Sequence, residues 1–164
     1  MQASDTTGND KVRNERTRGD LLSECACFDL RRATRAISRM YDDFMRDAGL
    51  NITQYSLLRV ISREKELSIS TLGRYMVMDR TSITRALAPL ERDALIHSRP
   101  GADKRIRIVS VTNKGRKLVE QADPKWQQAQ EALLETIGVD RWRAMSTVLR
   151  DTTRMVRQRE HTAD

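Results

Sequence analysis

Hydrogen-bond donors crowd two short stretches of this sequence. The first stretch holds five polar side chains within six residues: Arg80, Thr81, Ser82, Thr84 and Arg85. The second stretch, further along the chain, contains Asp103, Lys104, Arg105 and Arg107. Arginine can bind guanine through two hydrogen bonds, and serine and threonine hydroxyls can reach bases or phosphates. This chemistry is typical of proteins that bind duplex DNA.

A helix should present the first stretch, because a helix fits into the major groove. The spacing predicts a helix over residues 79–93, with Asp79 as its N-cap. One face is apolar and carries Ile83, Leu87, Leu90 and Ala94. The opposite face carries Thr81, Arg85, Ala88 and Arg92. Pro89 should bend this helix or interrupt its bonding, but the donors of the first stretch precede it.

A shorter helix is expected just before this one, after a short strand at residues 67–69. Ser70 is its predicted N-cap. Its buried side is formed by Leu72, Tyr75 and Met76. Ser70 and Thr71 would contact the DNA backbone at the start of this helix. Two helices joined in this way form a helix-turn-helix unit.

The second stretch lies in a predicted β-hairpin. Pro100 and Gly101 mark its turn, and residues 105–111 form a strand whose inward residues include Val109. A thin ribbon that carries Arg105 can enter the minor groove, where the negative potential is strongest. Asp103 would orient the Arg105 guanidinium. The alternative for the hairpin alone is an ordinary solvated turn.

Long amphipathic helices flank this central part. Residues 20–48 carry an apolar stripe at helical spacing, which Gly49 ends. Thr53 is the predicted N-cap of a second helix, and Thr112 is the predicted N-cap of a long helix after the hairpin. Gly138 separates that helix from a last one.

The composition agrees with an anionic partner. The 164 residues have a formal net charge of +7, and 32% of them are charged. Aromatic residues make up 4%, too few for extensive stacking on single-stranded nucleic acid. The sequence shows no apolar run typical of a membrane span or a signal peptide, so the expected location is the cytoplasm. Residues 1–19 are polar without periodicity, and we interpret them as a flexible extension.

Residues 103–115 follow a specific pattern: Asp-x-Arg, an alternating strand, an apolar residue, Thr, two residues and Gly. This pattern resembles the wing of the MarR family of bacterial and archaeal transcription regulators. Residues 50–55 and 90–96 also match that family. Val111 stands where the family usually has leucine, and Ala94 stands where it often has glycine.

The resemblance implies a mainly α fold with a small β-hairpin wing. One MarR-type domain would span residues 20–164, with a winged helix-turn-helix at 53–112 and dimerisation helices at 20–49 and 113–160. A homodimer would read a pseudo-palindromic operator whose half-sites lie about 10 bp apart. The terminal helices also carry large apolar residues that a small lobe could hardly cover alone: Trp126, Leu133, Trp142 and Leu149.

Two cysteines, Cys25 and Cys27, lie at the start of the first expected helix. Side chains two residues apart on a helix point about 200° apart, so an internal disulfide is not expected. Thiols near a helix N-terminus are readily oxidised. Cys27 and Phe28 resemble the Cys-Phe pair of the peroxide-sensing branch of the family, in which Tyr41 matches one of two tyrosines and Arg31 replaces the other. The alternatives are small apolar side chains in a dimer interface and metal binding.

The resemblance also implies an effector pocket between the dimer helices and the DNA-binding lobe. By family position its lining includes Arg35, Arg39, Tyr41 and Tyr55. Arginines at such a place suit a small aromatic or anionic effector. The alternative is that these arginines lie on a solvated helix face.

The function that follows is a sequence-specific transcriptional regulator, a dimeric repressor that a small organic ligand or cysteine oxidation releases from double-stranded DNA. The alternative is a winged-helix protein-interaction module without effector response. We do not expect an enzyme, because the sequence shows no nucleophile–base pairing and no glycine-rich phosphate loop. No cofactor or metal is expected either, because His97 and His161 lie far apart and the cysteines lack ligand spacing.

Overall fold

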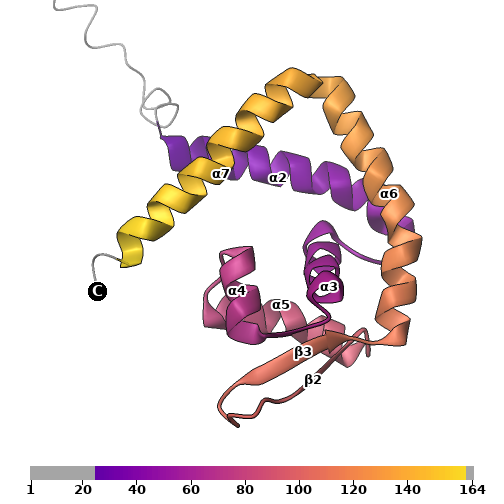
Figure 1. Ribbon diagram of the computed structural model, residues 1–164. Coiled ribbons are helices and arrows are strands. Elements are labelled where there is room, and N and C mark those ends of the chain that lie inside the picture. Colours follow the sequence, from indigo (N-terminus) through magenta and orange to yellow (C-terminus); the bar gives the residue numbers. More distant parts are fainter. Residues whose placement is uncertain (1–24, 162–164) are drawn as a thin grey trace, which may run out of the picture. The chain divides into compact units, whose positions relative to one another are not determined.

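The computed structural model describes residues 25–161 (Figure 1). The extension predicted at residues 1–19 and the first part of the helix predicted at 20–48 lie outside the described residues. The chain divides into two compact units, Met1–Arg39 and Met40–Asp164. The described part of the first unit is Cys25 and the N-terminal portion of α2 (Ala26–Met45), where most side chains are exposed.

The second unit contains the end of α2 and all later elements. These are the 3-10 helix η1 (Arg46–Ala48), α3 (Ile52–Glu64), β1 (Glu66–Ser68), α4 (Ile69–Met76), α5 (Arg80–Arg92), β2 (Ile96–Pro100), β3 (Arg107–Val111), α6 (Asn113–Ile137) and α7 (Val139–His161). Helices dominate, and the strands form one small antiparallel sheet. The predicted fold class is therefore confirmed.

The sheet has β3 in its centre, with β1 on one side and β2 on the other. Ile96 pairs with Val111 at one end of the hairpin and Pro100 pairs with Arg107 at the other. The strand expected at residues 67–69 lies one residue earlier, at Glu66–Ser68. Val111 and Val109 are buried, as the alternation predicted.

Two predicted N-caps are wrong by two residues. Asn51, not Thr53, caps α3, because Asn51 Oδ1 accepts the backbone N–H of Gln54 at 2.9 Å. The Gln54 side chain in turn accepts the Asn51 N–H at 3.1 Å, which completes a capping box. Ser68, not Ser70, caps α4 through a 3.0 Å bond from the backbone N–H three residues later. Ser70 therefore lies in the first turn of α4.

The other two predicted caps are confirmed. Asp79 Oδ1 accepts the backbone N–H of Ser82 at 2.8 Å and caps α5. Thr112 Oγ1 accepts the backbone N–H of Gly115 at 3.0 Å and caps α6. Both helices continue past an internal proline.

The core lies in a winged-helix lobe, which we define as residues 50–122. Its largest fully buried side chains, with Met45 from the end of α2, are Leu57, Leu58, Ile61, Leu72, Ile83, Leu90 and Val109. Burying each such side chain contributes roughly 1.5–3 kcal/mol. Gly115 lets the start of α6 approach the lobe closely, since an added Cβ would lie 2.2 Å from the Leu95 carbonyl oxygen.

α7 differs from the lobe in its burial. None of the α7 side chains that the structure describes is buried. Trp142, Met145 and Leu149 are half-buried, and Val148 and Met155 are exposed by 63% and 55%. In the described part of the chain, no helix combines the length and apolar character that crossing a bilayer requires.

Candidate nucleic-acid interface

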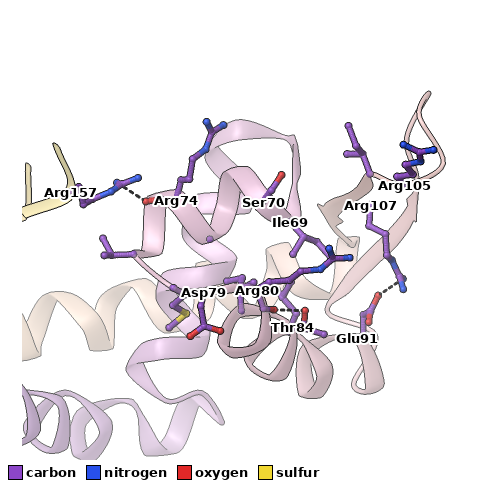
Figure 2. A pocket seen from close by; sticks show the side chains of 16 residues that line it. Ile69, Ser70, Arg74, Asp79, Arg80, Thr84, Glu91, Arg105, Arg107 and Arg157 are labelled. Atoms are coloured by element: carbon purple, nitrogen blue, oxygen red, sulfur yellow. Dashed lines mark hydrogen bonds and ion pairs between the residues drawn. The ribbon is translucent and has the colours of Figure 1, made fainter. Parts of the chain in front are cut away.

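A groove of about 910 Å³ lies among α4, α5, the wing and the end of α7 (Figure 2). The wing is defined here as β2, β3 and the turn between them. Apolar residues in the groove lining include Ile69, Val77, Met78, Ile83 and Leu87. Five arginines line it as well: Arg74, Arg80, Arg105, Arg107 and Arg157. Of the described residues that line it, only Asp79 and Glu91 are acidic, so this basic groove attracts an anionic partner.

α5 turns its polar face away from the core. The five donors of the first stretch, Arg80, Thr81, Ser82, Thr84 and Arg85, are all exposed. Ile83, Leu87 and Leu90 are buried on the other side and anchor the helix in the lobe. The Thr84 hydroxyl donates to the Arg80 carbonyl at 2.7 Å, so this hydroxyl is used within the helix. Among the five donors of the first stretch, Arg80 and Arg85 are the longest on the exposed face of α5.

The N-terminus of α5 is occupied by its own cap. Besides the backbone bond, the Ser82 hydroxyl donates to Asp79 Oδ2 at 2.7 Å. The backbone N–H of Ser82, and then its hydroxyl, lower the pKa of Asp79 below its usual value. The carboxylate therefore stays ionised at neutral pH and takes the place where a helix N-terminus would otherwise bind a phosphate. The side chains of α5, such as exposed Arg80, therefore remain as its groups for an anionic partner.

At the start of α4, Ser70 is exposed and lines the basic groove. Its Oγ lies 2.9 Å from Ser68 Oγ. Thr71 is half-buried, and its Oγ1 accepts bonds from Ser68 Oγ at 2.8 Å and from Arg74 Nη2 at 3.2 Å. The structure thus brings Ser70 to the groove and engages Thr71 mainly in the cap of α4.

In the wing turn, Asp103 has a different role from the predicted one. Its Oδ1 accepts the backbone N–H of Arg105 at 2.9 Å. Its carbonyl accepts the Ile106 N–H at 2.9 Å. Asp103 therefore shapes the turn backbone, and the expectation that it orients the Arg105 guanidinium is not what the structure shows. Lys104 and Arg105 are exposed at this turn.

Arg107 braces the wing against α5. Its Nη2 lies 3.4 Å from Glu91 Oε1 and also donates to Ser98. Both partners of the ion pair are largely exposed, and such pairs contribute only about 0–1 kcal/mol. Arg107 could therefore exchange Glu91 for a phosphate at little cost in stability.

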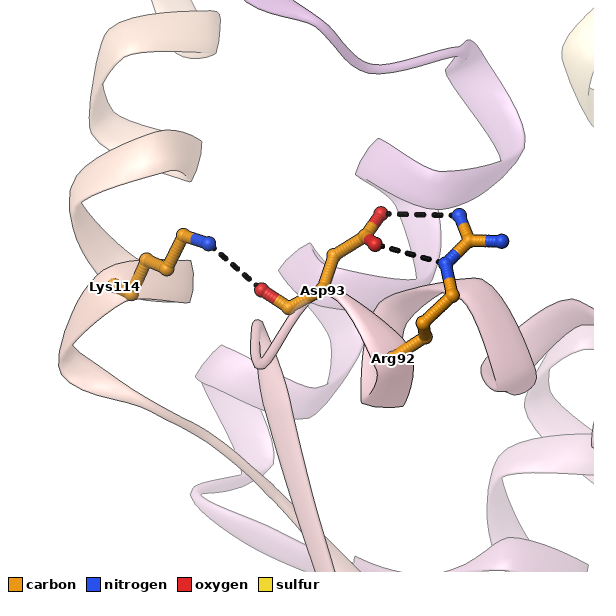
Figure 3. A network of polar contacts seen from close by, with 3 residues as sticks. All are labelled: Arg92, Asp93 and Lys114. Atoms are coloured by element: carbon orange, nitrogen blue, oxygen red, sulfur yellow. Dashed lines mark hydrogen bonds and ion pairs between the residues drawn. The ribbon is translucent and has the colours of Figure 1, made fainter.

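The C-terminal end of α5 is joined to α6 by a small polar network (Figure 3). Arg92 Nε donates to Asp93 Oδ1 at 3.0 Å, and this bond is the main reason why the pKa of Asp93 is lowered. Lys114 Nζ donates to the Asp93 carbonyl at 2.8 Å. Next to it, Ala94 has a left-handed backbone with φ +54°. These bonds join the C-terminal end of α5 to the start of α6 within the lobe.

The two tyrosines predicted to line an effector pocket are buried and bonded to α6. Tyr41 OH donates to Gln130 Oε1 at 2.7 Å, and Tyr55 OH donates to Asp123 Oδ1 at 2.7 Å. Arg59 Nη1 adds a 3.0 Å bond to Asp123. Burial raises the pKa of both tyrosines, and for Tyr55 the bond to Asp123 adds to the effect. Both hydroxyls are thus used in packing the second unit.

The other ligand and redox candidates belong to the first unit. Arg35 and Arg39 are exposed on α2. Cys25 precedes α2 and Cys27 lies in its first turn, and both thiols are free and exposed. Within residues 25–161, no group of three or more His, Cys, Asp or Glu side chains is placed to hold a metal ion.

Sequence reasoning missed two arginines of the basic groove. Arg74 follows Thr71 by three residues on the same helix, so helical spacing could have found it. Arg157 comes from α7 and donates from Nη1 to the Arg74 carbonyl at 2.9 Å, across 83 residues of chain. No local pattern indicates a contact of that range.

Comparison with known proteins places this arrangement in a family. A family model described as MarR family matches residues 48–106. The HTH-type transcriptional regulator SarZ of Staphylococcus epidermidis is 30% identical over 96 residues, or 58% of this chain. The chain spans 65% of the length of such curated relatives.

Solved structures extend the likeness. The M. tuberculosis transcriptional regulator MosR in complex with DNA is 35% identical with a TM-score of 0.72, covering 82% of this chain and 99% of that one. A cysteine-to-serine mutant of E. coli MarR, complexed with operator DNA, has a TM-score of 0.69 at 18% identity, covering 75% of this chain and 89% of that one, and shows the shared fold alone. On the family match and the MosR likeness, this chain belongs to the MarR family.

Proposed function

We propose that this protein is a dimeric transcriptional regulator that binds a pseudo-palindromic operator in duplex DNA. The binding surface would consist of the basic groove together with the exposed face of α5 and the wing turn beside it, where Arg85 and Lys104 lie outside the groove lining. The observation that carries the proposal is that exposed arginines of α5 and the wing line one groove, while the opposite face of α5 is buried in the lobe. α5 would lie in the major groove and the wing would reach the adjacent minor groove. The DNA complex of the 35% identical MosR supports this use of the fold.

Within this proposal the polar residues divide by position. Those on the exposed face of α5 would contact bases or nearby phosphates: Arg80, Thr81, Ser82, Thr84 and Arg85. Ser70, Thr71 and Lys104 would contact the DNA backbone. Arg105 would enter the minor groove, with Asp103 holding the turn behind it. Arg107 would leave Glu91 for a phosphate.

The dimer is part of the same proposal. Residues 53–112 would form the DNA-reading part, and residues 20–49 and 113–160 would form the dimerisation region. The exposed apolar side chains of α7, Val148, Met155 and Val156, support an association between copies. Two-fold symmetry would then place the half-sites about 10 bp apart. Bound at a promoter, such a dimer would act as a repressor.

We further propose that a small organic ligand or oxidation of Cys25 and Cys27 releases the repressor from DNA. The exposure of both thiols supports access by an oxidant. For a ligand, Arg35 and Arg39 supply charge for an anionic molecule, and Tyr41 and Tyr55 lie in the helices that the resemblance assigns to the pocket. Release by oxidation requires the cysteines, whereas release by a ligand does not, so one experiment separates the two routes.

DNA binding is tested by selecting a duplex from a randomised pool and measuring its binding by fluorescence anisotropy. Arg85→Ala should cost about 1–3 kcal/mol and relax sequence choice. Arg105→Ala should weaken binding and lower the salt slope by about one. Arg143→Ala, which removes an arginine paired with Asp140 on α7, is the control and should bind like wild type.

Two results would contradict this proposal in different ways. If Arg85→Ala and Arg105→Ala both bind like wild type, the reading surface is assigned wrongly. If the selection yields no preferred sequence, the protein is better described as a winged-helix protein-interaction module.

Release is tested by repeating the titration after mild peroxide treatment, with the Cys25→Ser, Cys27→Ser double variant as control. Loss of binding in wild type that the double variant resists would assign release to the thiols. Binding that survives peroxide in both proteins would exclude the thiols and direct the search to small organic anions.

A further inference from the structure

The C-terminal part of α7 makes a direct contact with the helix-turn-helix unit. Arg157 Nη1 donates to the carbonyl oxygen of Arg74 at 2.9 Å (Figure 2). Arg157 is half-buried, whereas Met155, Val156 and Gln158 around it are exposed. This side chain is therefore where α7 meets α4.

The acceptor of this bond lies in the last turn of α4. Carbonyls at a helix C-terminus lack partners within the helix and carry partial negative charge, so a cation there is favourable. The Arg74 carbonyl also accepts the Val77 N–H at 3.4 Å. Val77 adopts a left-handed backbone with φ +52°, although it is not glycine. Arg157 thus supports the point at which α4 stops.

The end of α4 is packed tightly against the turn that leads to α5. The Met78 N–H donates to the Gly73 carbonyl at 2.9 Å, and a Cβ added to Gly73 would lie 3.0 Å from the Met78 carbonyl oxygen. The next residue, Asp79, is the N-cap of α5. A shift of the end of α4 must therefore move the start of α5, where Arg80 lies.

The same turn of α7 carries part of the surface proposed to bind a second copy. Met155 and Val156, immediately before Arg157, are exposed by 55% and 53%. A change in how two copies pack on these residues would move the Arg157 backbone and hence its contact with α4. The same turn of α7 thus carries residues of the proposed dimer interface and the contact with α4 of the helix-turn-helix unit.

We propose that Arg157 is a positioning residue that fixes α4 and α5 relative to α7, and so sets the separation of the two DNA-reading lobes in the dimer. This inference rests on the proposed function. Although Arg157 lines the basic groove, the proposed role acts through the Arg74 carbonyl and requires no contact between Arg157 and DNA. Its loss should therefore change how strictly the protein demands one half-site spacing, while the number of phosphate contacts stays the same.

The test uses the full-length protein and a duplex selected from a randomised pool by wild type, with variants that insert or delete one base pair between the half-sites. One base pair rotates a half-site by about 35°. We expect Arg157→Ala to bind the original spacing about 5- to 10-fold more weakly and to discriminate less against the altered spacings. The salt slope should not change, and Arg157→Lys should restore most of the discrimination.

The matched control is Arg154→Ala. Arg154 lies on the same helix, and its Nη2 pairs with Asp151 Oδ1 at 2.7 Å, so the variant loses the same charge without touching α4. It should bind every spacing like wild type. If Arg157→Ala lowers the salt slope by about one and keeps the spacing preference, Arg157 contacts phosphate and the positioning role is wrong.

A second measurement needs no DNA and separates this inference from the proposed function. Amide hydrogen exchange at Val77 and Met78 should be roughly threefold to tenfold faster in Arg157→Ala than in wild type and unchanged in Arg154→Ala. Equal exchange in all three proteins would overturn the positioning role even if the protein binds its operator as proposed. Faster exchange in a protein without any sequence preference would support the contact and reject the DNA-binding function.

Discussion

The winged-helix lobe and α7 are both built from amphipathic elements, but they cover their apolar residues differently. In the lobe, side chains such as Leu58, Leu90 and Val109 are completely buried by the same chain. In α7, Val148 and Met155 remain more than half exposed, and none of its described side chains is buried. An apolar stripe on a helix thus predicts a buried face without saying which molecule buries it.

If two copies associate as proposed, this difference places stability and association in separate regions. The lobe should owe its folding to contacts within one chain, which do not depend on protein concentration. α7 should gain its remaining burial from a second copy, so its stability should follow mass action. Substitutions in each region test whether the lobe and α7 differ in this way.

The largest effect is expected in the lobe core. Leu58→Ala removes a fully buried side chain and should lower the free energy of unfolding by about 2–5 kcal/mol at any protein concentration. Leu149→Ala, the same change at a half-buried position of α7, should cost about 1 kcal/mol or less in dilute protein. Urea unfolding at several concentrations measures both values. Equal losses would show that α7 is as self-sufficient as the lobe.

The next effect concerns association. Val148→Asp places a charge on the exposed apolar face of α7 and should weaken dimerisation by about 2–3 kcal/mol, since the charge would lose water in the interface. Sedimentation over a concentration series measures the dimer dissociation constant. Thr147→Asp adds the same charge on the polar face with Arg143 and Arg154, so it should leave association unchanged. A dimer that tolerates Val148→Asp must use another surface.

A smaller effect, a gain in stability, is expected from a substitution in the segment between α5 and β2. Ala94 has φ +54°, a conformation that glycine adopts more easily than alanine. Ala94→Gly should raise the free energy of unfolding of the lobe by about 0.5–1 kcal/mol without changing dimerisation. Ala88→Gly, at an exposed position inside α5, should instead lower stability by about 1 kcal/mol. Thermal unfolding compares the two, and a loss in both variants would argue against strain at Ala94.

The smallest effect is a change in stability that occurs only at acidic pH. Because the folded-state pKa of Asp79 lies below its unfolded value, its ionised form stabilises the lobe above the usual carboxyl pKa. That contribution is lost as the pH falls below about 4 and through the lowered pKa. Asp79→Asn keeps a capping side chain without a titrating group, so stability should fall less steeply with acid than in wild type. Urea unfolding at a series of pH values measures this difference. If the stability of the two proteins falls equally with acid, Asp79 does not have this role.

Local patterns predicted the elements because each relies on neighbours in the sequence. The apolar spacing of α5, the Asp79 and Thr112 caps and the alternation in β3 are all read within a few residues. The prediction of Ser70 as the cap of α4 was wrong. Ser68 is also a hydroxyl residue, and the strand β1 that ends at Ser68 runs directly into α4.

Arg74 could have been found from helical spacing, but other features that sequence reasoning missed depend on turn geometry or on distant residues. Asp103 was placed correctly in the wing, but whether it binds the backbone or the side chain of Arg105 is settled by the turn geometry. The Tyr55–Asp123 bond joins α3 to α6, and the Arg157 contact joins α7 to α4. No spacing rule covers such pairs, because the path of the chain between them decides whether they meet.

The lobe and α7 also each have a tryptophan whose fluorescence can report on that region. Trp126 stacks on Tyr55 with ring centroids 6.0 Å apart, against the lobe core. Trp142 lies half-buried on α7. In a dimer covered as proposed, the emission of Trp142 would follow the meeting of two chains, and the emission of Trp126 would follow the melting of the lobe. Replacing one tryptophan at a time would assign the change in emission to the other, and so show which of the two events comes first.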